Sequence, residues 1–185
     1  MSHQQQEQPP DGDAYALKLT LDRLVRNGGT LLGVPSVSVA LLDPETGDLI
    51  TWAALGAGPE GPRHTRFRSN EGIAGWVAAH LEPAIVHDTN RDSRFKPLGG
   101  ARIRSMLCVP LIDVDQLLGT LTATSPVPGA FDAQRQQLFQ IFADQAVLAI
   151  GKTRQAEGAK AQARELAALL DASRALTSSL EPGQV

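Results

Sequence analysis

The segments SMLCVPLI (residues 105–112) and LLGTLTAT (residues 117–124) decide the fold that this sequence predicts. Both are short apolar runs separated by the polar residues 113–116, a pattern typical of a β-hairpin. Successive side chains on a strand point to opposite faces. One face of 117–124 is thus predicted to carry Leu117, Gly119, Leu121 and Ala123, and the other Leu118, Thr120, Thr122 and Thr124. The sequence predicts a sheet with one apolar face for helices and one hydroxyl-lined face that can border a small-molecule pocket.

A second hairpin is predicted nearer the N-terminus. Val37, Val39 and Leu41 alternate with small or polar residues, the segment 43–48 (DPETGD) is rich in turn formers, and 49–55 returns as a strand. The first strand of this hairpin divides its faces in the same way as 117–124. That agreement favours placing the two strands in one sheet.

Three helices are expected around these strands. The first begins after Asp13 and ends at NGG (27–29), because glycines commonly terminate helices. EGIAGWVAAH (71–80) is a short helix, followed by a brief strand at 84–87 and an irregular polar connection over 88–100. The longest periodic segment begins at Phe131-Asp132, with Asp132 as its N-cap.

The last helix is predicted to continue to residue 180. From residue 138 onward, positions spaced alternately three and four apart form one stripe, apolar at both ends and polar around Lys152 and Gln155. Gly151 and Gly158 weaken the stripe further. A solvated connector helix and a dimer stalk both fit this pattern.

Composition excludes several classes of protein. The chain has 185 residues, 42% of them hydrophobic, and a formal net charge of −3, which argues against a nucleic-acid or anionic-membrane partner. It contains no run of the roughly 18 apolar residues that would span a bilayer, and its polar N-terminus does not resemble a signal peptide. One cysteine cannot form an internal disulfide framework. We therefore expect a cytoplasmic protein.

The predicted domain organisation has four parts. Residues 1–12 are a polar, mobile tail, and 13–152 form one domain. Residues 153–180 are a connector helix, and 181–185 end as though a further domain should follow.

Several motifs in the same order resemble those of a GAF domain, over roughly residues 14–155. They are EGIAGWV (71–77), DTNRDSRF (88–95), RSMLCVPL (104–111) with LGTL (118–121), FD (131–132) and DQAVLAI (144–150). The resemblance implies an α+β fold of the GAF/PAS-like kind. Its central antiparallel sheet of five to six strands would have the N- and C-terminal helices on one face and a pocket-forming helix and loop layer on the other.

The resemblance also implies a function. It suggests a sensory domain, not itself an enzyme, that binds a small ligand and signals through its C-terminal helix to an output domain. LLDASRAL (169–176) is similar to the opening helix of a second, tandem GAF domain. The implied context is a multidomain bacterial signalling protein of the two-component or cyclic-dinucleotide type. A homodimer through the terminal helices is expected, and the ligand would alter its geometry. The alternative is a ligand-free module whose role is only to form such dimers.

The ligand is left open, and neither bilin nor haem is expected. Cyclic-nucleotide-binding members of the family carry an Asn-Lys signature that SPVPG (125–129) lacks, and bilin-binding members attach the pigment to a cysteine usually followed by His, whereas Val109 follows Cys108. The free methionine sulfoxide reductases of the family need more than one thiol for their disulfide cycle, and this chain has only Cys108.

Candidate ligand-binding residues come from the predicted polar face and from the segments that would cover it. Trp76 can stack a planar ligand or simply pack in the core. Arg104 can grip a carboxylate or phosphate, although the basic residues around it (Arg63, His64, Arg66, Arg68 and Arg102) fit a solvated sheet edge better. The complete predicted set is Trp76, Asp88, Phe95, Arg104, Ser105, Thr120 and Thr122.

Other candidate sites fail on their chemistry. GAGPEG (56–61) matches a dinucleotide-binding motif, but Pro59 and Pro62 deny it the helix that the motif requires. Asp88, Asn90 and Asp92 have calcium-loop spacing without the loop's Gly and Glu, so capping and turn formation explain them better. His80 and His87 fit surface histidines better than haem ligands, and Cys108 fits a small buried side chain. No metal site and no catalytic set of nucleophile, base and orienting residue is predicted.

Overall fold

The computed structural model of the chain describes residues 12–56, 65–68, 70–97 and 102–179. In these residues, six strands form an antiparallel sheet in the order β3-β2-β1-β6-β5-β4. The strands are β1 (Ser36–Leu42), β2 (Leu49–Leu55), β3 (Arg66–Phe67), β4 (Ala84–Val86), β5 (Ser105–Asp113) and β6 (Gln116–Ser125). Both predicted hairpins are present, and β1 pairs directly with β6, which confirms that the two strands with matching faces share one sheet.

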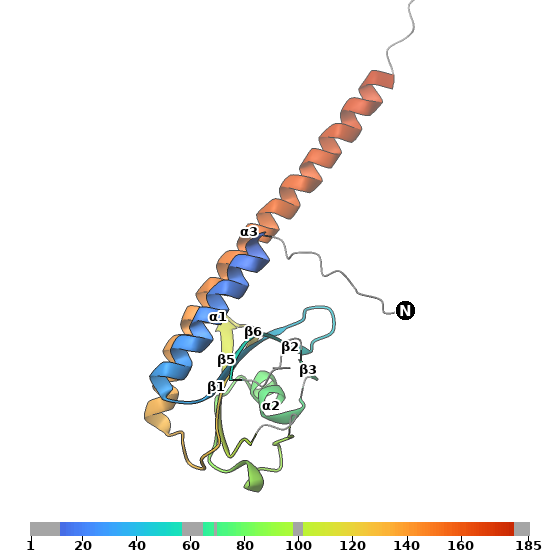
Figure 1. Cartoon of the computed structure of the whole chain (residues 1–185). Helices are drawn as coiled ribbons and strands as arrows, with labels where there is room; N and C mark the ends of the chain where they lie inside the picture. The colour runs from blue at the N-terminus through green and yellow to red at the C-terminus, as the bar shows by residue number, and fades with distance from the viewer. Residues whose placement is uncertain (1–11, 57–64, 69, 98–101, 180–185) are drawn as a thin grey trace, which may run out of the picture.

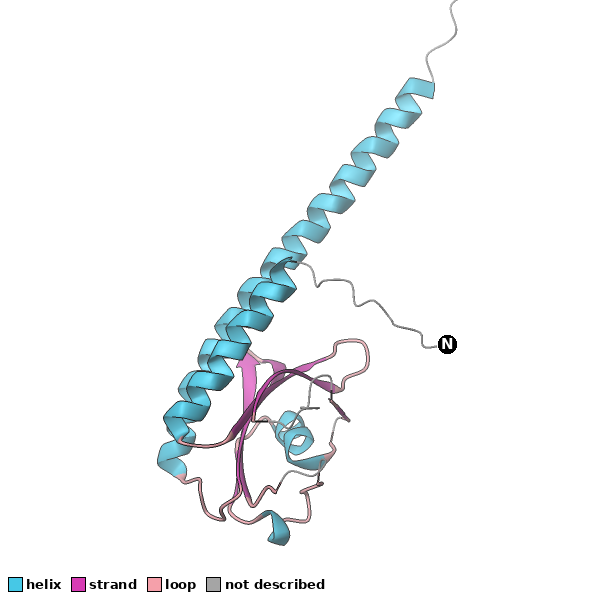
Figure 2. Cartoon of the chain, in the orientation of Figure 1, coloured by secondary structure: helices cyan, strands magenta, loops and turns pink. Residues whose placement is uncertain are grey.

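Helices cover the two faces of the sheet unequally. Helices α1 (Gly12–Leu32) and α3 (Ala133–Ser179) lie side by side on one face, and the short helix α2 (Gly72–His80) lies on the other (Figure 1). Loops, including the 3₁₀ turn η1 (Thr89–Arg91), complete the α2 side (Figure 2). We call the two faces the α1/α3 side and the α2 side. The predicted α+β fold is confirmed.

The α1/α3 side holds the main hydrophobic core. Alternate residues of the central strands point into it, as the sequence pattern predicts: Val37, Val39, Leu41, Leu107, Val109, Leu111, Leu121 and Ala123. Phe139, Ala143, Ala146 and Ile150 of α3 pack on them, and each is at most 1% exposed. Burying a large apolar side chain completely contributes about 1.5–3 kcal/mol, so this layer fixes the first part of α3 to the sheet.

The predicted faces of Leu117 and Leu118 were wrong. Leu111 pairs with Gly119 and Ile112 with Leu117, so Leu118 is an extra residue in β6. This bulge turns Leu118 into the core of the α1/α3 side, while Leu117 packs on the α2 side. A bulge reverses the alternation at one point, and both leucines fit an apolar environment, so composition alone did not show it.

The predicted end of α1 was also wrong. The helix starts at Gly12, so Asp13 lies inside it, and it continues through Gly28 and Gly29 to Leu32. A Cβ atom on Gly29 would lie 2.4 Å from Cδ2 of Leu55, so this glycine permits close packing of α1 on β2. Gly33, with φ +63°, adopts the left-handed conformation that ends the helix.

Helix α3 begins as predicted and is unbroken to Ser179. The carboxylate of Asp132 accepts a hydrogen bond from the backbone N–H of Arg135 at 2.8 Å, which is N-cap geometry. Gly151 and Gly158 lie within the helix without ending it. In Figure 1 the later part of α3 extends far past the sheet and past the start of α1. The predicted tail, apart from Gly12, and the predicted end at 181–185 lie outside the described residues.

The described edges of the sheet are short. Edge strand β3 has two residues and edge strand β4 has three. β4 begins at Ala84, which is paired with Cys108, and in the described sheet Pro110 of β5 is paired with Thr120 of β6 alone.

We predict that Gly119→Ala destabilises the domain while Gly158→Ala does not. A Cβ on Gly119 would lie 2.1 Å from the backbone oxygen of Ala40, so β1 and β6 would have to separate. Overpacking of this kind costs about 1–3 kcal/mol or more. No atom lies within 4 Å of a Cβ on Gly158, and Ala in place of Gly stabilises a helix interior by about 0.5–1 kcal/mol. Urea unfolding of both variants measures the difference, and equal midpoints would contradict the close approach at Gly119.

Candidate functional site

The α2 side of the sheet carries the hydroxyl-lined surface that the sequence predicts. Thr120 and Thr122 of β6 lie on it, and Thr122 is paired across the sheet with Cys108 on one side and Ser38 on the other. Helix α2 covers the ends of this surface through two small apolar clusters. Thr120 is buried, whereas Thr122 and Ser38 are only half-buried. These two hydroxyls are therefore the part of the sheet that a small molecule would meet first.

Trp76 lies on α2, next to the cluster of Ile73, Val77, Ala84, Val86 and Cys108. Its ring is already engaged by two side chains. The imidazole of His80 stacks on it with ring centroids 4.3 Å apart, and the guanidinium carbon of Arg94 lies 4.6 Å from the ring centroid. A planar ligand could stack fully on Trp76 only by displacing one of them.

Phe95 is half-buried and packs against the same cluster. Its neighbour Arg94 is held by a bidentate ion pair with Asp92, whose shorter N···O distance is 2.7 Å. The hydrogen bond from Arg94 holds the pKa of the Asp92 carboxyl below its ordinary value. Lys96 forms a further ion pair with Glu71, at the start of α2, and the Lys96 hydrogen bond likewise lowers the pKa of Glu71.

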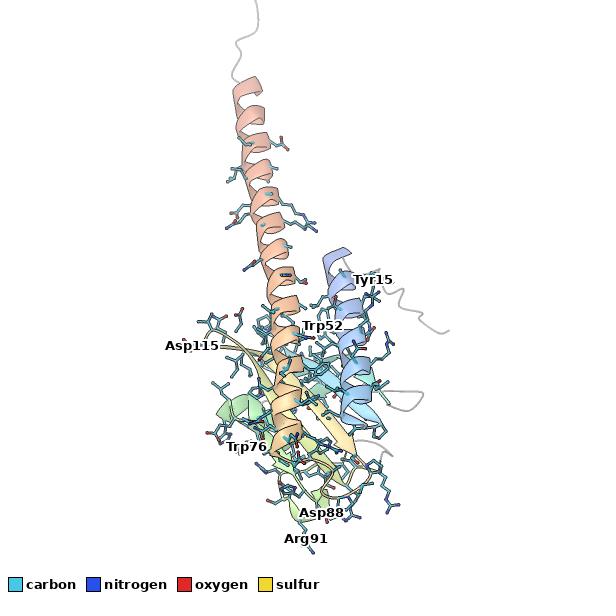
Figure 3. The ribbon with its side chains drawn as sticks, turned by 90° about the vertical axis from the view of Figure 1, so that its left-hand side faces the viewer. Tyr15, Trp52, Trp76, Asp88, Arg91 and Asp115 are labelled. Atoms are coloured by element: carbon cyan, nitrogen blue, oxygen red, sulfur yellow. The ribbon has the colours of Figure 1, made fainter. Side chains whose placement is uncertain are left out.

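Asp88 and Arg104, both predicted site residues, bind each other. The Arg104 guanidinium donates to both carboxylate oxygens of Asp88, at 3.0 Å and 3.2 Å. This hydrogen bonding is the main reason that the pKa of Asp88 lies below its ordinary value. A carboxylate or phosphate ligand on Arg104 would therefore compete with Asp88. Figure 3 shows Asp88 and Arg91 at the end of the domain away from the projecting part of α3.

Ser105 does not lie on the α2 side. It alternates with Met106 and Cys108, which belong to the α2 side, so it points to the opposite face. Its hydroxyl is completely buried and donates to the backbone oxygen of Val127 at 2.7 Å. The role that this contact indicates is to hold the loop between β6 and α3.

Cys108 is fully buried, as its small apolar character predicts. The hydroxyl of Thr122 donates to its sulfur at 3.2 Å. Burial raises the pKa of the Cys108 thiol to about 12, so the native protein holds it as an unreactive thiol near neutral pH.

Capping and turn formation explain the residues with calcium-loop spacing, as predicted. Asp88 accepts the backbone N–H of Asn90, and Asp92 accepts that of Arg94. In the described part of the chain, no three His, Cys, Asp or Glu side chains could share a metal ion. The motif at 56–61, apart from Gly56, lies outside the described residues, as do Arg63 and His64.

The sequence interpretation missed two residues. Ser38 lies next to Thr122 on the strand opposite to Cys108, so the three side chains form a row across the sheet. The matching alternation of 36–42 and 117–124 is the sequence signal that indicates this face for Ser38. Arg94 covers Trp76 from a loop 18 positions away in sequence. No local pattern marks such a contact.

Helices α1 and α3 border an open groove of about 360 Å³ on the other side of the molecule. Its lining residues are Ala16, Leu17, Thr20, Gln145, Leu148, Ala149, Lys152 and Thr153. None of the helices in the described residues is both long and apolar enough to cross a membrane.

This architecture, an antiparallel sheet with terminal helices on one face and a short helix with loops over a polar face, defines a class of small α+β domains. A model of the GAF domain family matches residues 16–150. The chain belongs to the GAF domain family.

Solved structures show the same fold at low sequence identity. The GAF domain of an Acinetobacter phosphoenolpyruvate-protein phosphotransferase is 22% identical with a TM-score of 0.70, and the match covers 77% of this chain and 86% of that one. Free methionine-R-sulfoxide reductase of Neisseria meningitidis, solved with its substrate, is 19% identical with a TM-score of 0.68, covering 78% and 87%. At these identities the likeness shows the fold alone.

A probable 3′,5′-cyclic phosphodiesterase, pde-5 of Caenorhabditis elegans, is 30% identical over 88 residues. The match covers 45% of this chain and 12% of the length of that relative.

We predict that the Asp88–Arg104 pair makes stability depend on pH in the acid range. The folded-state pKa of Asp88 is lowered from 3.8, so its stabilising effect is complete well above pH 3.8 and is lost as pH falls through the folded value. Asp88→Asn should lower the melting temperature at pH 7 and lose less on acidification from pH 5 to pH 3 than the wild type. The matched control is Asp115→Asn, on the exposed turn between β5 and β6 (Figure 3). If the melting temperatures of Asp88→Asn and wild type fall by the same amount between pH 5 and pH 3, the contribution of the Asp88–Arg104 pair is contradicted.

Proposed function

We propose that this GAF domain is a regulatory module that binds a small molecule on the α2 side and transmits the change through α3 to an output domain. The main support for the proposal is that strands β5 and β6 contribute side chains to both faces of the sheet. Cys108 and Thr122 face the predicted ligand surface, while Leu107, Val109 and Leu121, on the same strands, support α3. A change in the twist of this strand pair therefore acts directly on the base of the helix.

The energies involved are compatible with such coupling. Two linked sites typically share a coupling free energy of about 1–3 kcal/mol. Partial loss of packing at one or two buried side chains under α3, such as Phe139 or Ile150, has a similar magnitude. Repacking at the base of α3 is therefore sufficient to shift an equilibrium between two states of the helix.

The proposed ligand surface consists of the half-buried hydroxyls of Ser38 and Thr122, the edge of Trp76, and the charged pair Asp88–Arg104. It suits a small ligand with hydrogen-bonding groups and a flat part. Cyclic nucleotides belong in any screen because the aligned relative pde-5 is named as a cyclic phosphodiesterase. The protein is proposed not to be an enzyme, since the buried, un-ionised thiol of Cys108 does not suit the chemistry of a sulfoxide reductase.

The output side is proposed to be a signalling enzyme of bacterial type, a histidine kinase or a cyclic-dinucleotide enzyme. The support for this is α3 itself. Residues 162–171 are exposed, so the described chain gives this part of the helix no core of its own to pack on. A long helix of this kind can connect a sensory domain to a neighbour that it regulates.

A second candidate function, ligand-free dimerisation, is favoured by a different observation. The stripe predicted along the last helix points outward at Ile141, Leu148, Leu166 and Leu169, which are 54–66% exposed. The adjoining α1 also exposes the apolar side chains of Tyr15 and Leu19. Two copies could bury these side chains against each other, with or without a ligand on the α2 side.

We predict that native mass spectrometry of the purified chain will show a retained small molecule, or that a thermal-shift screen of cyclic nucleotides, haem and amino acids will find one that binds. A ligand at 100 times its dissociation constant adds about 2.7 kcal/mol, which raises the melting temperature of a domain of this size by roughly 5–10 °C. Trp76→Ala should abolish that shift, and Trp52→Phe, on the α1/α3 side, should retain it. A flat screen without a retained mass would favour the second function.

We predict that Leu148→Glu converts a dimer into a monomer. A charge at this exposed position, 66% accessible in one copy, would be buried without a partner in the dimer. Light scattering measures the mass, and urea unfolding should show that the fold is retained. Val127→Glu, which changes an exposed apolar residue outside the helices, is the control and should leave the dimer intact. A monomeric wild type would count against dimerisation altogether.

A further inference from the structure

The described segment 88–97, which lies between β4 and β5 and includes η1, has two parts that are held in different ways. Residues 88–91 are tied to the backbone ahead of β5. The N–H of Thr89 donates to the oxygen of Arg104 at 3.0 Å, and the Thr89 hydroxyl donates to the oxygen of Ile103 at 2.7 Å. Thr89 is buried, and Asp88 adds its ion pair with Arg104. We call residues 88–91 the anchor.

Residues 92–97, which we call the arm, are held by side chains. The backbone hydrogen bond described for the arm, from the N–H of Phe95 to the oxygen of Asp92, is internal to it. Three side chains reach across to α2 and its surroundings. Arg94 lies over Trp76, Phe95 packs on the cluster that contains Cys108, and Lys96 pairs with Glu71.

Each arm contact is weak. The side chains of Lys96 and Glu71 are 60% and 43% exposed, and ion pairs this accessible contribute little because water and salt screen them. An accessible cation–π contact such as that of Arg94 is also modest. Among the described residues the arm has no strand pairing, and segments with few buried contacts and no backbone ladder open locally at far lower cost than the whole fold.

We propose that the arm is a hinged strap that opens about the anchor and uncovers Trp76 and the Cys108 cluster. In the closed state, the Arg94 guanidinium occupies the indole on which a planar ligand would stack, and Phe95 covers the cluster beneath. Opening removes both together because they are neighbours in the chain. The α2 side is therefore closed in its resting state. The contacts of the arm determine how easily a ligand reaches Trp76 and the Cys108 cluster.

This inference rests on the proposed function only in naming the α2 side as the ligand's side, since strap opening is measurable without any ligand. The single cysteine is the reporter. Cys108 is a fully buried member of the cluster on which Phe95 packs, so a thiol reagent such as dithionitrobenzoate reaches it only after an opening event. The rate of labelling at saturating reagent, and its dependence on urea, separate local opening from global unfolding.

The test compares the full 185-residue wild type with Arg94→Gln/Lys96→Gln. We expect the double variant to label Cys108 about tenfold faster in water, with weak urea dependence at low urea. The removed contacts are lost in the open state and in the unfolded state alike, so the midpoint of global unfolding should fall by no more than the same tenfold factor accounts for. Arg66→Gln is the matched control, because it removes ion pairs with Asp43 and Asp48 at the opposite edge of the sheet. It should label at the wild-type rate.

Equal labelling rates in all three proteins, or labelling that follows global unfolding at every urea concentration, would overturn the strap. A retained ligand in native mass spectrometry together with that result would support the proposed function and reject only the strap. If the double variant labels fast and without urea dependence but the protein binds no small molecule, the strap is supported and the proposed ligand-binding function is rejected.

Discussion

The pairing of β5 with β6 is the constraint on which the rest of this structure depends. These two strands lie inside the sheet, and each must satisfy two different environments at once. One face supports α1 and α3 through an apolar core, and the other presents Cys108, Thr120 and Thr122 to α2 and its loops. The bulge at Leu118 lets both faces remain filled, because it turns one leucine to each side.

The two sides of the sheet are stabilised by different kinds of interaction. The α1/α3 side is a large, dry core that contains side chains such as Phe139 and Leu21. The α2 side has smaller clusters and several accessible ion pairs. Apolar burial contributes far more per side chain than accessible charge pairing. We therefore expect local opening to occur on the α2 side at lower cost than on the α1/α3 side.

The sequence predicted most of the fold because its signals are local. Alternation in 36–42 and 117–124, the turn formers at 43–48 and the N-cap Asp132 each act within a few residues. The errors have physical causes of a different kind. Gly28 and Gly29 carry the composition of a helix end, but the helix continues through them, and at Gly29 the absence of a Cβ atom lets α1 approach Leu55 of β2 closely.

The candidate site was harder to predict for the same reason. Asp88 and Arg104 were each chosen from the sequence, yet no spacing rule showed that they would bind each other. The contact of Arg94 with Trp76 and the orientation of Ser105 likewise depend on how separate segments meet. The faces of the strands could be predicted, whereas the partners of side chains on the loops could not.

The position of Pro110 has a consequence for the behaviour of the protein at high concentration. β4 begins opposite Cys108, so the part of β5 that contains Pro110 has no neighbour on that side in the described sheet. Proline has no N–H to donate, and natural sheets use proline and very short outer strands to discourage strand addition by another molecule. At this position the protein combines both devices, which should discourage another molecule from adding a strand along this unpaired edge of β5.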